Sequence, residues 1–188
     1  MEKNDKKKED DEKEEIILFE EGTENNNNNS ESTENEMLTL PEFYLECARF
    51  GELEDMKNAL KDAEKDFNYN IKDFNGNTAL HMSSANGHLN IVKYLIEDLK
   101  CDINCKNNSN NTPLHWAAIN GQKDIVCYLL DKNADFDIVN NNNKKASEEA
   151  YDNCYYDISE IILNKENEKN PKINESEIDK DEFDDKNN

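Results

Sequence analysis

The stretch NTPLHWAAING at residues 111–121 decides the fold, because a close copy, NTALHMSSANG, stands upstream at residues 77–87. The two stretches are offset by 34 residues. Each is followed at the same offset by a second matching segment, NIVKYLI at 90–96 and DIVCYLL at 124–130. A repeat of this length is typical of a solenoid, in which each unit buries its apolar face against its neighbours.

Local signals place a helix within each stretch. Thr78 and Thr112 are suited to cap a helix N-terminus, because a threonine hydroxyl accepts a hydrogen bond from an unpaired helix N–H. Pro113 stands at the first helical position, where its missing N–H leaves no bond unmade. Gly87 and Gly121 are suited to the left-handed turn that ends a helix. Each stretch is therefore predicted to form a short helix between its threonine and its glycine.

Two weaker copies flank these full repeats. Residues 43–53 fit the pattern upstream at an offset of 36, and residues 146–163 fit it downstream at an offset of 33. Degenerate end units are expected in a stacked array, because each end has one face toward water. We therefore expect an all-α solenoid over residues 37–163. The expected repeats are 37–73, 74–107, 108–140 and 141–163.

These residues resemble the ankyrin repeat, and the resemblance covers about 37–163. Its most specific part is Thr-Pro-Leu-His followed by Trp-Ala-Ala at 112–118, then Ile-Val-x-Tyr-Leu-Leu at 125–130. The resemblance implies a finger-like turn followed by two antiparallel helices in each unit. It also implies a structural role for His81 and His115, whose imidazoles would hydrogen-bond the backbone of neighbouring turns.

The chain departs from the ankyrin pattern at several turns. Asparagine replaces the usual glycine at Asn110, Asn133 and Asn143, and among non-glycine residues asparagine tolerates the left-handed conformation best. In the fourth copy Glu148 stands in place of histidine and Cys154 in place of glycine. The helices of the fourth repeat are therefore the least firmly predicted.

Acidic residues dominate the chain, whose formal net charge is -22. Residues 1–36 hold five lysines against fourteen acids, residues 164–188 five against nine, and residues 37–163 twelve basic residues against twenty-one acids. The two ends have too few apolar groups to offset their ordering entropy, so we expect disordered acidic tails. The charge disfavours direct binding to nucleic acid or anionic membranes and favours a basic protein partner. Tails that only promote solubility fit the composition equally well.

No pattern in the sequence indicates catalysis, a metal site or a cofactor. The five glycines form no phosphate-binding loop, and no nucleophile motif occurs. A calcium loop at 131–141 would need a glycine and a terminal glutamate that are absent. The five cysteines form no CxxC pair, and the first residues are charged, unlike a signal peptide. We expect a monomeric, non-enzymatic protein of the cytoplasm, with the nucleus left open as a second location.

The resemblance places the binding surface on a concave face made of finger turns and first helices. Aromatic residues and methionine followed by carboxylates at one end suit an amphipathic basic helix. For Met82 and Trp116, packing between repeats is an alternative of equal weight. The expected partner contacts are Phe50, Phe74, Asn75, Met82, Asn86, Trp116, Ile119, Asn120, Glu149 and Asp152.

Residues 78–88, 112–121 and 46–54, together with the acidic C-terminal tail, resemble a smaller eukaryotic group within the ankyrin proteins. The fungal member of that group is a dedicated chaperone for a basic small-subunit ribosomal protein (the S-three protein). The resemblance implies an escort that masks a basic ribosomal or other RNA-binding protein. The alternative is a generic adaptor or inhibitor of a folded signalling or transcription protein.

Overall fold

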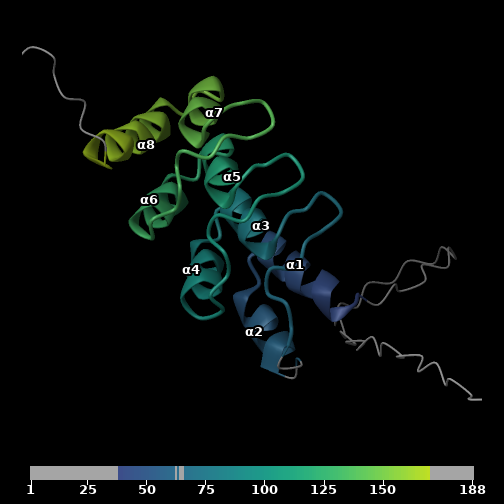
Figure 1. Cartoon of the computed structure of the whole chain (residues 1–188). Coiled ribbons are helices and arrows are strands. Elements are labelled where there is room, and N and C mark those ends of the chain that lie inside the picture. Colours follow the sequence, from purple (N-terminus) through teal and green to yellow (C-terminus); the bar gives the residue numbers. More distant parts are fainter. Residues whose placement is uncertain (1–37, 62, 64–65, 170–188) are drawn as a thin grey trace, which may run out of the picture.

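The computed structural model describes residues 38–61, 63 and 66–169; the expected tail at 1–36 and residues 170–188 lie outside the described residues. The helices of the described part form four hairpins, which confirms the predicted all-α solenoid (Figure 1). They are α1 (Leu40–Phe50), α2 (Leu53–Lys61), α3 (Ala79–Asn86), α4 (Leu89–Glu97), α5 (Pro113–Ile119), α6 (Lys123–Asp131), α7 (Ala146–Asp152) and α8 (Tyr156–Lys169).

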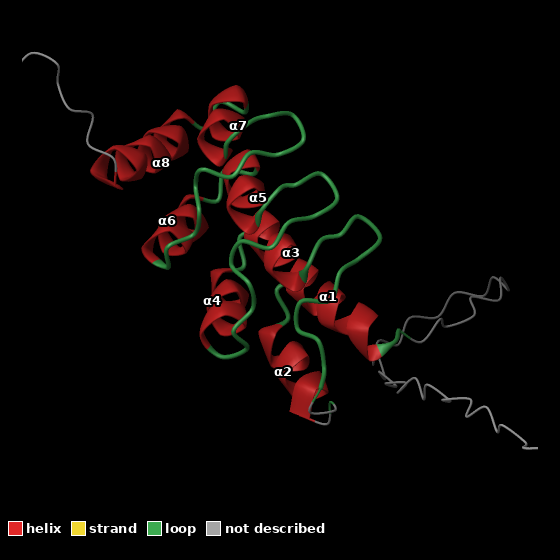
Figure 2. Cartoon of the chain, in the orientation of Figure 1, coloured by secondary structure: helices red, strands yellow, loops and turns green. Residues whose placement is uncertain are grey.

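The hairpins stack so that their first helices form one row and their second helices another. In the inner row α1, α3, α5 and α7 pack one against the next, and α2, α4, α6 and α8 lie on one side of it (Figure 1). The long loops between hairpins project on the other side (Figure 2). The inner helices approach closely because small residues line their contacts. Fully buried examples are Ala48, Ala79, Ser84, Ala117, Ala118, Ala146 and Ala150.

His81 connects the start of α3 to the loop of the following repeat. The backbone N–H of Thr78 donates to His81 Nδ1 at 3.2 Å, so the ring proton belongs on Nε2, which donates to the Asn111 carbonyl oxygen at 2.9 Å. His115 repeats the arrangement one unit later, with Nε2 3.1 Å from the Lys144 carbonyl oxygen. Desolvation lowers the pKa of His81 to about 4 and also lowers the pKa of His115. Both imidazoles are therefore neutral links between repeats at pH 7.

The turns adopt the left-handed conformation where the sequence predicts it. Gly87 and Gly121 have φ of 84° and 71°, and α5 begins at Pro113. In the fourth repeat Cys154 takes the same conformation, with φ of 65°. Asparagine does so at Asn110 (57°), Asn133 (62°) and Asn143 (58°). Asparagine thus replaces glycine without a change in the fold of these turns.

Asparagine side chains also join neighbouring loops to one another. Asn107 Nδ2 donates to Asn77 Oδ1 at 2.8 Å, and one repeat later Asn140 Nδ2 donates to Asn111 Oδ1 at 2.9 Å. The Oδ1 atom of Asn107 accepts the N–H groups of Ser109 at 3.0 Å and Asn111 at 2.9 Å within its own turn. A primary amide can do both because it carries donors and an acceptor. The loops are therefore one hydrogen-bonded array.

The folded part extends further toward the C-terminus than the sequence predicts. The expected boundary is residue 163, but α8 continues to Lys169, so residues 164–169 belong to the last helix and not to a tail. One reason is an ion pair between Lys145 Nζ and Glu166 Oε1 at 2.6 Å, which ties the last turns of α8 to the start of α7. The apolar periodicity ends at residue 163, before Glu166, and therefore did not include this contact. The expected boundary at 163 is corrected to 169.

Candidate functional site

The expected partner contacts lie on the inner helices and the projecting loops, a region that we call the inner surface. Trp116 on α5 occupies the same repeat position as Met82 on α3, and Asn86 occupies the same position as Asn120. Phe74 lies at the tip of the first loop, which closes with a hydrogen bond from the Gly76 N–H to the Asp73 carbonyl oxygen at 2.9 Å. The fold therefore brings residues that are 34 apart in sequence onto one continuous surface.

Two phenylalanines on the inner surface are largely exposed. The side chain of Phe74 is 96% exposed and that of Phe50, at the end of α1, is 66% exposed. Beside Phe74 is a hollow of about 430 Å³ with a mainly apolar lining. The hollow is lined by Leu38, Pro41, Glu42, Leu45, Glu46, Arg49, Ile71, Lys72, Asp73, Phe74 and Met82. An exposed apolar area of this kind marks a surface suited to interaction.

Two expected contacts, Met82 and Glu149, are buried, which removes Glu149 from the accessible surface. Met82 is only 7% exposed and packs into the core, as the packing alternative expects, and its remaining surface lines the hollow beside Phe74. Glu149 is 9% exposed, and its Oε1 atom accepts a hydrogen bond from Asn140 Nδ2 at 2.7 Å. Its carboxylate is thus used inside the fold. The sequence pattern did not predict that the loop between α6 and α7, which carries Asn140, covers Glu149 on α7.

Trp116 combines a buried edge with a partly exposed one. Its side chain is half-buried, and its indole Nε1 is shielded from solvent without a hydrogen-bond acceptor among the described residues. A buried donor without an acceptor is costly. The buried edge of the ring thus fits packing between repeats, and the exposed edge is available on the inner surface.

The remaining expected contacts are accessible, but several are already hydrogen-bonded. The Nδ2 atoms of Asn86 and Asn120 donate to the carbonyl oxygen four residues earlier in their own helices, at 3.0 Å and 2.8 Å. Both side chains are exposed, whereas Ile119 is half-buried. Asp152 is exposed and forms an ion pair with Lys144. Each asparagine thus presents a fixed side chain, while Asp152 presents a partly neutralised charge.

A cysteine and a histidine lie close together in the core, which raises the question of a nucleophile. Cys105 Sγ is 3.7 Å from His81 Nδ1 and 3.4 Å from Thr78 Oγ1. Burial raises the pKa of the Cys105 thiol to about 11 and lowers that of His81 to about 4. Both groups are therefore neutral at pH 7, and the thiol is not activated. At 8% exposure Cys105 is also out of reach of a substrate.

Within the described ranges, no three histidine, cysteine, aspartate or glutamate side chains gather as a metal site. None of the helices in that part of the chain combines the length and apolar content needed to cross a bilayer.

Sequence reasoning missed a group of exposed tyrosines at the C-terminal end of the array. Tyr151 and Tyr156 are 61% and 56% exposed, and their rings meet edge to face with centroids 5.1 Å apart. Tyr155, also partly exposed, lies over Gly121. The available signal was three tyrosines within six residues of the degenerate fourth repeat. At the position of Tyr151 the preceding repeats have alanine or serine.

Stacked helical hairpins with projecting loops define a solenoid whose extended surface is used for binding. A sequence profile of ankyrin repeats (three copies) matches residues 45–140, just over half of the chain. The chain belongs to the ankyrin-repeat proteins, and ankyrin repeats mediate protein–protein binding. The fourth hairpin, α7 and α8, lies beyond the matched residues, in line with its degenerate sequence. No curated protein matches the chain.

Proposed function

We propose that this protein is an escort that binds a basic RNA-binding protein and masks its charge before it meets RNA. A ribosomal protein is the partner that the sequence resemblance implies, and the cytoplasm or nucleus is where the two would meet. The inner surface makes the contact. Phe50, Phe74 and Trp116 serve as its apolar anchors, and no chemical step is involved.

The exposure of Phe74 is the observation on which the proposal mainly rests. The ring is 96% exposed at the tip of a turn whose backbone is held in place. Asp73 Oδ1 accepts the N–H groups of Asn75 at 2.9 Å and Asn77 at 2.7 Å, and the next loop bonds to the Asn75 carbonyl oxygen at 3.0 Å. Because the backbone beneath the ring is already ordered, binding has to order only the side chain, and aromatic side chains dominate interface energetics.

Charge supports a basic partner over a neutral one. The repeat region, residues 37–163, carries twenty-one acids against twelve basic residues, and both flanking segments are acidic as well. An acidic surface attracts lysine- and arginine-rich segments and repels RNA phosphates. The hollow beside Phe74 places three carboxylates (Glu42, Glu46 and Asp73) and two cations (Arg49 and Lys72) next to apolar side chains, which leaves a small excess of negative charge. A segment that alternates apolar and basic residues would satisfy both.

Affinity purification with the full chain tests this proposal. The bait is compared with a Phe50→Gln, Phe74→Gln double variant, which keeps the net charge and alters only exposed side chains. Tyr128→Gln on α6, in the outer row, is a control that removes a half-buried aromatic ring away from the inner surface. We expect a basic RNA-binding protein with the parent and the control, and at least tenfold less of it with the double variant.

The outcome also separates the escort from the adaptor. The purified pair should stay soluble when RNA is added, and the double variant should let the basic protein precipitate or bind RNA. Specific recovery of a near-neutral signalling or transcription protein, lost in the same double variant, would make the generic adaptor the correct function. Equal recovery by parent and double variant would remove the inner surface as the binding site.

A further inference from the structure

The inner row ends at α7 with a face that resembles a covered interface but has no cover among the described residues. In each earlier repeat the next inner helix packs on this face (Figure 1). Ala48, Ser84 and Ala118, which occupy one repeat position there, are fully buried. Tyr151 occupies the same position on α7 and is 61% exposed. On the neighbouring outer helix, Leu163 is 44% exposed.

The exposed face is hollowed, which distinguishes it from a flat polar cap. A cavity of about 420 Å³ opens between α7 and α8. Its lining includes Tyr151 and Leu163 as apolar walls, with Ser147 and Ser159 at the floor and Glu148 and Asp152 beside them. The ring of Tyr156 extends the apolar wall through its edge-to-face contact with Tyr151. We call this region the end face.

We propose that the end face binds an amphipathic basic helix of the partner protein, stacked on α7 as a further inner helix would be. The proposal rests on the proposed function for the existence of a basic partner. A helix is indicated because α3, α5 and α7 each pack on the equivalent face of the inner helix before them. The apolar stripe of the bound helix would contact Tyr151 and Leu163.

Charge indicates which kind of helix fits. Glu148, Asp152 and Glu160 are exposed around the end face; Glu160 shares a helical face of α8 with Tyr156 because they are four residues apart. One cation, Lys144, lines the cavity, and it is paired with Asp152. Lysine or arginine residues flanking an apolar stripe would therefore find carboxylates, and arginine could also stack on a tyrosine ring.

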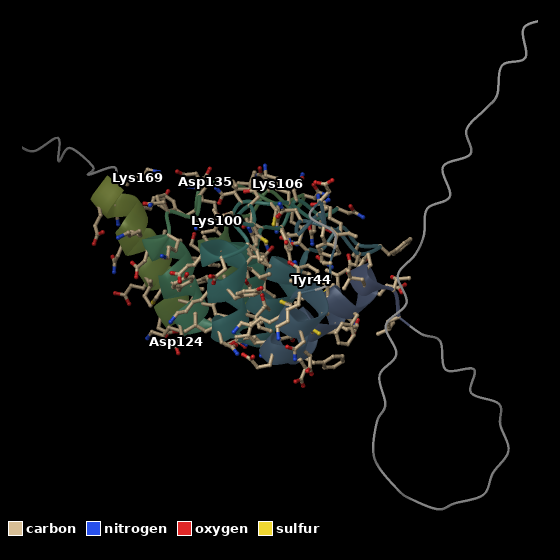
Figure 3. The ribbon with its side chains drawn as sticks, turned by 90° about the horizontal axis from the view of Figure 1, so that it is seen from below. Tyr44, Lys100, Lys106, Asp124, Asp135 and Lys169 are labelled. Atoms are coloured by element: carbon tan, nitrogen blue, oxygen red, sulfur yellow. The ribbon has the colours of Figure 1, made fainter. Side chains whose placement is uncertain are left out.

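The same charges disfavour the other occupants. Residues 170–188 of this chain follow α8 directly, but they carry seven acids against three lysines, so like charges would meet. Lys169, the last residue of α8, lies far along the array from Tyr44 of α1 (Figure 3), so α8 ends on the same side of the array as the end face. Nearness along the chain would favour residues 170–188 as the occupant of the end face, but their negative charge opposes it. A second copy of the chain brings a net charge of -22 and is opposed more strongly.

The probe for this site is a designed amphipathic peptide of leucine and lysine, about 14 residues long so that it can form a helix. Two further peptides serve as controls: one with the same composition in scrambled order, and one with glutamate in place of lysine. Binding of each labelled peptide to the full chain is measured by fluorescence anisotropy at physiological salt. The amphipathic basic peptide should bind at least tenfold more tightly than either control.

Two matched double variants locate the binding. Tyr151→Gln with Leu163→Gln changes the end face, and Phe50→Gln with Phe74→Gln changes the inner surface; both keep the net charge and alter exposed side chains. Superimposed thermal melts would confirm that each variant is folded. We expect the end-face variant to lose at least tenfold in peptide affinity and the inner-surface variant to lose less than twofold.

The other results have distinct meanings. If the inner-surface variant alone weakens the peptide, or if the scrambled peptide binds as well, the end-face proposal is wrong while the proposed function stands. If removal of residues 170–188 raises peptide affinity tenfold, the chain's own segment occupies the face. A dimer that dissociates in the end-face variant would identify a second copy as the occupant. Equal binding of the acidic peptide would instead contradict the proposed basic partner.

Discussion

The imidazole of His88 lies over Gly51 of the preceding repeat. Its Nε2 atom is 3.0 Å from the Arg49 carbonyl oxygen, and a Cβ atom on Gly51 would lie 2.8 Å from the ring. Gln122 covers Gly87 in the same way one repeat later. The glycine that ends each of these inner helices is thus required twice, for its left-handed backbone and for the side chain that the next repeat places on it.

Gly121→Ala should destabilise the protein by about 2 kcal/mol or more. Gly121 has φ of 71°, and a Cβ atom there would lie 2.5 Å from the Tyr155 ring. The methyl group therefore adds a steric conflict with the fourth repeat to the backbone strain. Chemical denaturation of the parent and the variant measures the difference in the free energy of unfolding.

Cys154→Gly is the matched control at the equivalent position of the last repeat. Cys154 has φ of 65° and is exposed, since no described repeat follows to cover it. Glycine should remove backbone strain there, leaving stability unchanged or raising it by up to about 1 kcal/mol. If Gly121→Ala left stability as unchanged as this control does, the packing of the Tyr155 ring over Gly121 would not restrict the residue at that position.

His81 should make stability depend on pH between about 6.5 and 4. Desolvation lowers its folded-state pKa to about 4 from the ordinary 6.5, so on acidification the unfolded chain takes up the proton first. Stability contributed by the neutral ring is present above pH 6.5 and is lost as the pH falls, by about 3 kcal/mol in total. His81→Gln should be less stable at pH 7 but should lose less on acidification. Denaturation at pH 7 and about pH 4.5 gives the change in the free energy of unfolding with pH for the parent and for the variant. An equal change in both would show that His81 is not the group responsible.

Asn140→Asp should cost about 2 kcal/mol or more at pH 7. Asn140 is 6% exposed, and its Nδ2 donates to Asn111 Oδ1 and to Glu149 Oε1. An aspartate there would lose both donations and place two carboxylates side by side in the interior. Asn107→Asp is the control. Asn107 is the equivalent of Asn140 one repeat earlier, and the residue equivalent to Glu149 there is Trp116, so the new carboxylate would meet no acid. In urea denaturation, the free energy of unfolding should be clearly lower for Asn140→Asp than for Asn107→Asp. Equal values would mean that the carboxylate of Glu149 does not contribute to the loss.

Trp116→Leu should leave the fold intact and weaken partner binding. The substitution is apolar and removes an indole N–H that lacks an acceptor among the described residues, so stability should change by less than about 1 kcal/mol. If the exposed edge of the ring anchors the partner, binding should weaken by about 2 kcal/mol. Calorimetric titration with the partner that affinity purification recovers measures the change in affinity. Unchanged affinity in the folded variant would make Trp116 a packing residue alone.

Deletion of residues 170–188 should slow association with a basic partner without affecting the melting temperature. The deletion removes seven acids and three lysines but keeps the whole of α8 and its Lys145–Glu166 ion pair. Electrostatic attraction acts mainly on the association rate and weakens with salt, so the difference should be largest at low ionic strength. Stopped-flow association at two salt concentrations measures it. The same rate and salt dependence in both proteins would reduce the segment to a solubility device.

The sequence by itself determined the repeat architecture, because its signals are local and recur: threonine caps, helix-ending glycines and an apolar stripe within each unit. The resemblance to the ankyrin repeat also placed Phe74 on the face made of finger turns and first helices, and the structure gives its exposure. Only the tertiary structure decided that Glu149 is bonded to Asn140, that α8 continues to Lys169, and that Tyr151 is uncovered. These features depend on which side chain a neighbouring repeat brings into contact, or on the fact that no described repeat follows α7 and α8. Such contacts join residues that periodicity alone does not relate.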